Sequence, residues 1–62
     1  MHPAATQEDK RDVRLALSID HGLSMKTALF LEALGRWVLD KGLALTKKQR
    51  ARLEEILEEH GR

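Results

Sequence analysis

The chain has 62 residues, and its 11 Lys and Arg against 10 Asp and Glu give a formal net charge of +1. This balance excludes a whole-molecule field that attracts nucleic acid or anionic membranes. Because the chain has no cysteine, disulfide frameworks, thiolate zinc sites and thiol nucleophiles are excluded too. A chain this short forms one domain at most (1–62) and buries only about 60% of its unfolded surface.

The first residues of the chain, 1–6, form a short segment that leads into a charged run, and no apolar stretch there resembles a signal peptide. We expect residues 1–6 to form a frayed leader. The most apolar segment, 29–39, is interrupted by Glu32, Gly35 and Arg36 and is shorter than the roughly 20 residues that a membrane span needs. We therefore expect a cytoplasmic protein with no membrane contact.

Three segments of the chain each begin with a hydroxyl residue, continue with periodic apolar residues and end near a glycine. This order is typical of capped helices, because a hydroxyl accepts hydrogen bonds from the first turn and glycine tolerates positive φ beyond the last. The sequence therefore predicts an all-α domain of three helices, at about 7–21, 25–41 and 47–60. The predicted caps and terminators are Thr6 with Gly22, Ser24 with Gly42, and Thr46 with Gly61, Thr46 forming a capping box with Gln49.

The first of these segments also has a strand interpretation. Val13, Leu15, Leu17 and Ile19 alternate with mostly polar residues, as on a half-buried strand over 13–19. That alternative gives a β-α-α order. The capping signals at both ends of the segment favour the helix.

The second predicted helix is apolar over more than half of its circumference. The residues of this arc are Ala28, Phe30, Leu31, Leu34, Trp37, Val38 and Leu39. An arc this wide needs cover from both neighbouring helices or from a second subunit. Gly35 costs up to about 1 kcal/mol relative to alanine inside a helix, and close approach of a partner helix is a physical reason for it.

The residues that carry chemistry do not form a recognisable catalytic or metal-binding pattern. His2, His21 and His60 are far apart, and none has the spacing of a metal-binding pair. Asp20 beside His21 is interpreted as a helix end, and His60 as a half-buried edge residue. No glycine-rich phosphate loop is present. We expect no enzymatic activity, no catalytic residues, no metal, no cofactor and no small-molecule substrate.

The third predicted helix has its charges in the order that the helix dipole disfavours. Four basic residues precede four glutamates, and each misplaced charge in an end turn costs roughly 0.3–1 kcal/mol at low salt. One interpretation is a solvated, screened face. A second is an anion site, because basic side chains beside free amides at a helix N-terminus bind phosphate. The candidate phosphate or DNA contacts are Lys41, Thr46, Lys47, Lys48, Arg50 and Arg52.

A third interpretation is antiparallel pairing of this helix with its copy in a homodimer, which lays each basic half against an acidic half. A twofold interface is self-complementary and would also cover the wide apolar arc of the second helix. The candidate interface residues are Ala28, Leu31, Gly35, Val38, Leu53, Ile56 and Leu57. A dimer would present two basic corners at a fixed spacing, as DNA half-site readers do.

The run from His21 through Gly22-Leu23-Ser24 to Thr27-Ala28, with Trp37 and Lys41-Gly42 beyond it, resembles the second helix of ribbon-helix-helix repressors. The resemblance covers about a third of the chain. It implies a paired β-ribbon in the major groove of DNA, with Ser24 and Lys26 as phosphate contacts. If 13–19 were the ribbon, Arg14, Ala16 and Ser18 would face DNA.

These patterns lead to two functional hypotheses. The first is a small dimeric DNA-associated regulator or accessory factor of the bacterial, phage or plasmid kind, which contacts phosphate through the basic corner. The alternative is a protein–protein interaction module, such as a small inhibitor or adaptor, that uses the apolar second helix or the charge-polarised third. Salt dependence separates them, because phosphate binding weakens steeply as salt rises.

Overall fold

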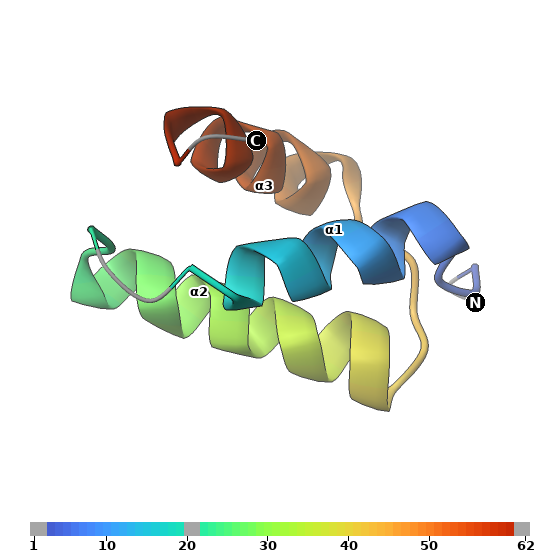
Figure 1. Cartoon of the computed structure of the whole chain (residues 1–62). Helices are drawn as coiled ribbons and strands as arrows, with labels where there is room; N and C mark the ends of the chain where they lie inside the picture. The colour runs from blue at the N-terminus through green and yellow to red at the C-terminus, as the bar shows by residue number, and fades with distance from the viewer. Residues whose placement is uncertain (1–2, 20–21, 61–62) are drawn as a thin grey trace.

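A computed structural model describes residues 3–19 and 22–60 of the chain. Within this part the chain forms three α-helices, α1 (Gln7–Leu17), α2 (Met25–Gly35) and α3 (Lys47–Glu59). A π turn, η1 (Arg36–Asp40), continues α2 (Figure 1). The prediction of a small all-α, three-helix domain is confirmed. The predictions for His2, Asp20 with His21, and Gly61 lie outside the described residues.

The three predicted N-caps are confirmed. The Thr6 hydroxyl accepts a hydrogen bond from the Asp9 amide at 3.1 Å, and the Asp9 carboxylate accepts one from the Thr6 amide at 3.2 Å. Thr46 and Gln49 form the predicted capping box in the same way, at 3.1 and 2.9 Å. The Ser24 hydroxyl accepts from the Thr27 amide at 3.2 Å. These bonds satisfy amides that a helix leaves free in its first turn, so each helix begins where its hydroxyl lies.

The C-terminal ends agree less well with the sequence. The helix α1 ends at Leu17 rather than near 21, because the Ser18 hydroxyl donates to the Leu15 carbonyl and the Ile19 amide bonds the Ala16 carbonyl. Gly22 has φ +78°, but it lies beyond the end of α1, so its assignment as the helix terminator is wrong. Gly42, with φ +69°, directly follows Lys41, the C-cap of η1. Its assignment as the terminator of the second helix is confirmed.

The strand alternative for 13–19 is wrong, since residues 13–17 lie in α1. Val13 and Ala16 are completely buried, whereas Leu15 and Leu17 are 46% and 42% exposed. A strand would have placed Val13, Leu15 and Leu17 on one face. The burial instead follows the three-residue spacing of a helix face.

The central element of the fold is α1. Figure 1 shows α1 lying along α2, with α3 on its other side, and α1 packs against α2, η1 and α3. The buried core takes residues from all of them, namely Val13, Ala16, Leu31, Leu34, Val38, Leu53, Ile56 and Leu57. The second helix is therefore covered on one face only, and the wide apolar arc predicted for it is not fully buried.

The residues before α1 are held by the segment that follows η1. The Ala5 amide donates to the Gly42 carbonyl at 2.8 Å, and the Ala44 amide donates to the Pro3 carbonyl at 2.9 Å. Ala4 and Leu43 form an isolated antiparallel bridge. The expectation of a frayed leader is thus wrong for residues 3–6, because backbone groups of the returning segment pair with them.

Gly35 has its reason inside the chain. A Cβ atom at Gly35 would lie 3.2 Å from a terminal methyl carbon of Leu17, so the missing side chain lets α1 approach α2 closely.

None of the described helices has the length and the hydropathy needed to cross a membrane.

Candidate functional site

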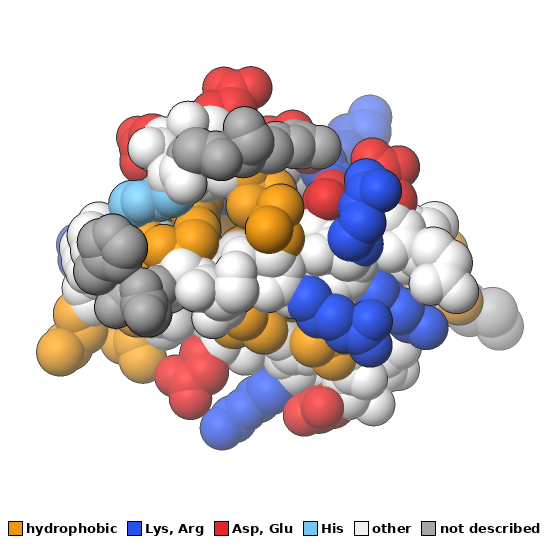
Figure 2. All heavy atoms as spheres, in the orientation of Figure 1, with side chains coloured by type: hydrophobic (Ala, Val, Ile, Leu, Met, Phe, Trp, Pro, Cys, Tyr) orange, Lys and Arg blue, Asp and Glu red, His pale blue; other side chains and the backbone are white. Residues whose placement is uncertain are grey.

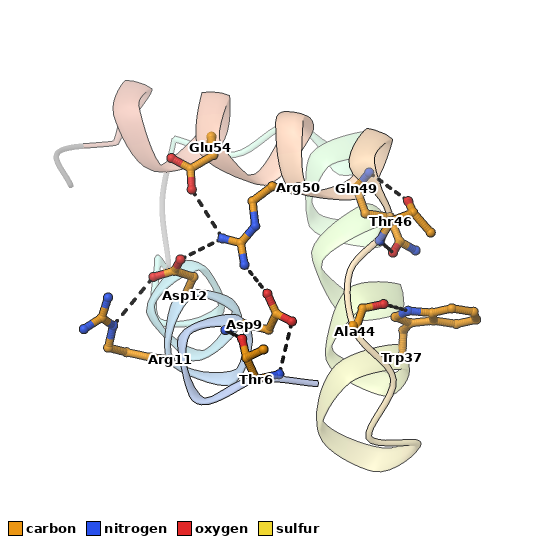
Figure 3. A network of polar contacts seen from close by, with 10 residues as sticks. All are labelled: Thr6, Asp9, Arg11, Asp12, Trp37, Ala44, Thr46, Gln49, Arg50 and Glu54. Carbon is orange, nitrogen blue, oxygen red and sulfur yellow. Dashed lines mark hydrogen bonds and ion pairs between the residues drawn. The ribbon is translucent and has the colours of Figure 1, made fainter. Parts of the chain in front are cut away.

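A cluster of charged side chains joins α3 to α1 around Arg50 (Figure 3). The Arg50 guanidinium donates hydrogen bonds to the Asp12 carboxylate at 2.8 Å, to the Asp9 carboxylate, and to the Glu54 carboxylate at 3.3 Å. The Asp12 side chain is only 2% exposed and the Arg50 side chain 28%. This cluster ties the first half of α3 to the first half of α1.

The carboxylates of the cluster keep the Arg50 guanidinium protonated and balance its positive charge. Burial by itself raises the pKa of Asp9, but the Thr6 amide and the Arg50 guanidinium outweigh it, and the pKa lies below its ordinary value. Burial likewise disfavours the charged form of Arg50, yet the Asp12 and Asp9 carboxylates raise its pKa above the ordinary value. An arginine held in this way by carboxylates has little attraction left for an external phosphate.

The prediction that Arg50 contacts phosphate therefore needs correction, because its guanidinium already binds the carboxylates of α1. The sequence did carry a signal for the cluster. Asp9, Asp12, Val13 and Ala16 share one face of α1, and all four are buried. Carboxylates placed on the apolar face of a helix need a cationic partner from elsewhere in the fold.

The other predicted phosphate contacts do not form a single corner. Lys47 and Lys48 are exposed in the first turn of α3. Arg52 is half-exposed and pairs with Glu55 at 3.4 Å. Lys41 directly follows η1 and is separated from the start of α3 by the connection 42–46. The Thr46 hydroxyl accepts the capping bond of α3.

The predicted dimer interface also needs correction. Five of its residues are at most 2% exposed in the core of one chain, namely Leu31, Val38, Leu53, Ile56 and Leu57. They are unavailable to a partner because α1 lies between α2 and α3 and covers both. Of the other two, Gly35 faces Leu17 and Ala28 is exposed. Antiparallel pairing of α3 would therefore join mainly charged faces, and exposed ion pairs contribute little.

An exposed apolar surface lies instead on the side of α2 that faces away from α1. We define the α2 outer face as Met25, Leu29, Glu32, Ala33 and Arg36. Met25 is 79% exposed and Leu29 is 58% exposed. Figure 2 shows hydrophobic side chains at the surface near the start of α2, with acidic and basic side chains alternating along the lower edge of the molecule. Within the described chain, both Met25 and Leu29 leave more than half of their surface exposed.

A shallow hollow of about 560 Å³ adjoins the exposed leucine of this face. Its lining residues are Leu29, Glu32, Ala33, Arg36, Trp37 and Lys41. The Trp37 indole donates a hydrogen bond from Nε1 to the Ala44 carbonyl at 2.8 Å (Figure 3). That bond fixes the half-buried ring as one wall of the hollow, so an apolar group entering it meets a preformed aromatic surface.

The remaining candidates have structural roles in this fold. The Ser24 hydroxyl, a phosphate contact implied by the repressor resemblance, donates to the Thr27 hydroxyl at 3.0 Å. His60 is half-buried at the C-cap of α3, as predicted. Over residues 3–19 and 22–60, no three His, Asp or Glu side chains are grouped in a way that could hold a metal ion.

Comparison of the chain with protein-family models, curated proteins and solved structures gives no match. The α2 outer face and the exposed basic residues of α3 are the two surfaces of the described chain that remain as candidate binding sites.

Proposed function

We propose that this chain is a protein-interaction module, a small adaptor or inhibitor, that binds through the α2 outer face. The observation that carries the proposal is Leu29, a large apolar side chain that is 58% exposed beside a hollow walled by Trp37. Exposed apolar side chains that gather on one face and are bordered by charged residues are typical of binding sites. Of the two hypotheses drawn from the sequence, this is the protein–protein interaction module, and the binding surface is the outer face of the second helix.

The energetics favour this face over the polarised face of α3. Full burial of a leucine or methionine side chain contributes roughly 1.5–3 kcal/mol relative to its exposed state, and Leu29 and Met25 both offer most of that area. The exposed charges of α3 offer at most about 1 kcal/mol per pair and are screened by salt. A partner therefore gains more free energy on α2.

Site-specific photo-crosslinking tests the proposal. A benzophenone amino acid placed at Leu29, in the cells that naturally express the chain, is expected to give a discrete protein adduct. The same amino acid at Glu58, exposed on α3, serves as the matched control and is expected to give none. Equal labelling from the two positions would contradict the proposal, because a partner bound at the α2 outer face contacts position 29 and not position 58.

A second candidate function is the DNA-associated regulator. It is favoured by one observation, the pair of exposed lysines, Lys47 and Lys48, beside the amides at the start of α3. With Arg50 neutralised, this surface offers fewer cations than the sequence suggested. Phosphate contact through it would be weaker and more dependent on salt.

Charge reversal tests the DNA hypothesis. The double variant Lys47→Glu with Lys48→Glu is expected to abolish duplex binding, measured by fluorescence anisotropy over a salt series. The parent's salt slope should include a contribution of about 2 from these lysines, since each phosphate contact adds about 0.9. Arg11→Glu with Arg14→Glu, both exposed on α1 and outside the α2 outer face, makes the same change in net charge elsewhere and is the control. Equal weakening by both double variants would indicate unspecific attraction only.

A further inference from the structure

We infer that the partner of the α2 outer face is a second copy of this chain, bound antiparallel across a twofold axis beside Ala33. The inference rests on the proposed function, because it names the occupant of the same face. It is carried by two features of the face, the placement of its apolar groups and the order of its charges.

The apolar groups of the face are self-complementary. Leu29, Ala33 and Trp37 follow one another at four-residue intervals along α2 and η1, and all three line the hollow. The protruding leucine and the tryptophan wall are thus each four residues from Ala33 along the chain. A twofold axis beside Ala33 seats Leu29 of each copy in the hollow beside Trp37 of the other. Ala33 is exposed and small, so the two helices can approach closely at the axis.

The charges of the face fit the same register. Glu32 and Arg36 lie along one edge of the hollow and are both exposed. Position 34 is the midpoint of this charged pair along the chain. The apolar groups place the twofold axis beside Ala33, one residue or about 1.5 Å away. In an antiparallel pair each edge meets the same edge of the other helix. Glu32 of each copy therefore lies opposite Arg36 of the other, which gives two ion pairs across the axis.

This register differs from the α3 pairing that the charge order of the sequence suggested. It uses apolar residues that are exposed in the single chain and leaves the core intact. Because only one helix from each chain is buried, the expected interface is of the smaller class, below about 1,200 Å² in total. Self-association is therefore expected at micromolar to millimolar concentration.

Sedimentation velocity on purified full-length chain tests the inference, with Trp37 fluorescence as a second readout. Trp37 is the only tryptophan, so its emission should shift to shorter wavelength as the chain is concentrated and Leu29 of the second copy enters the hollow. Leu29→Glu should abolish both the shift and the dimer. Lys48→Glu, an exposed charge change on α3, should leave both unchanged.

A charge swap tests the register itself. Glu32→Arg and Arg36→Glu each place like charges opposite one another in a homodimer, and each is expected to raise the dissociation constant about tenfold. An equimolar mixture of the two single variants should form a heterodimer about as tight as the parent, because every facing pair is again opposite in sign. The double variant should dimerise like the parent for the same reason. Circular dichroism checks that each variant keeps its helices.

The outcomes separate this inference from the proposed function. A parent chain that stays monomeric at millimolar concentration, or single variants whose mixture associates no better than either alone, would overturn the twofold pairing. If Leu29 then still crosslinks to a different protein, the interaction module stands and its partner is foreign. If Leu29 crosslinks to nothing, both proposals fail.

Discussion

Replacement of Arg50 by methionine is expected to destabilise the chain by about 2–4 kcal/mol, because it leaves the buried carboxylates of Asp9 and Asp12 without their cation. Methionine keeps most of the aliphatic stem, so the change isolates the charge. A chain of 62 residues has a total stability of about 3–9 kcal/mol, and the variant should therefore unfold substantially at moderate temperature. Urea denaturation followed by circular dichroism measures the loss.

The matched control for this variant is Arg52→Met on the same helix. Arg52 is 50% exposed and pairs with the exposed Glu55, so its loss should cost less than about 1 kcal/mol. Equal losses at positions 50 and 52 would show that the buried cluster does not contribute as argued.

The pH dependence gives an independent check on the cluster. The pKa of Asp9 is lowered in the folded chain, so the stability it contributes is fully present above the unfolded value near pH 4. That stability is lost as the pH falls through the lower, folded pKa. Without the guanidinium the Arg50→Met variant lacks much of this contribution. The difference in unfolding free energy between parent and variant should therefore shrink below about pH 4.

Replacement of Leu34 by alanine is expected to cost about 2–5 kcal/mol, the usual range for removing a fully buried leucine side chain. Leu34 is 1% exposed and packs in the core between the helices. At the upper end of this range the loss approaches the whole stability of the chain. The free energy of unfolding, measured with urea on dilute protein, gives the value.

The same substitution at Leu29 is the control, since the two leucines lie on the same helix and differ in burial. Leu29 is 58% exposed, so Leu29→Ala should cost less than about 1 kcal/mol in the monomer. A large loss at position 29 under dilute conditions would mean that this leucine packs within the chain, and it would remove the basis for the α2 outer face.

Local features of the fold were predictable because their causes lie within a few residues. Thr6, Ser24 and Thr46 accept hydrogen bonds from amides three residues ahead, and so each helix start could be located from sequence. Gly42 ends η1 with positive φ for an equally local reason. The early end of α1 also has a local cause, the bond from the Ser18 hydroxyl to the Leu15 carbonyl, but the glycine pattern placed that end near Gly22 instead.

Features that depend on packing were not predictable in the same way. Hydrophobic periodicity marks which face of a helix is apolar, but it does not say which helix lies in the middle. The structure puts α1 there, and Leu53 and Ile56 consequently enter the core instead of a dimer interface. Arg50 lies 38 residues from Asp12 along the chain, so only the folded arrangement brings the two side chains together.

The sequence by itself determined an all-α chain with three capped helices, because helix starts are set by hydrogen bonds between near neighbours. The tertiary structure alone decided which charges are neutralised and which apolar groups stay exposed. It turns Arg50 inward to two carboxylates and leaves Leu29 outside beside Trp37. The reason is physical, since burial is a property of the assembled helices, and no single helix carries enough information to choose its neighbour.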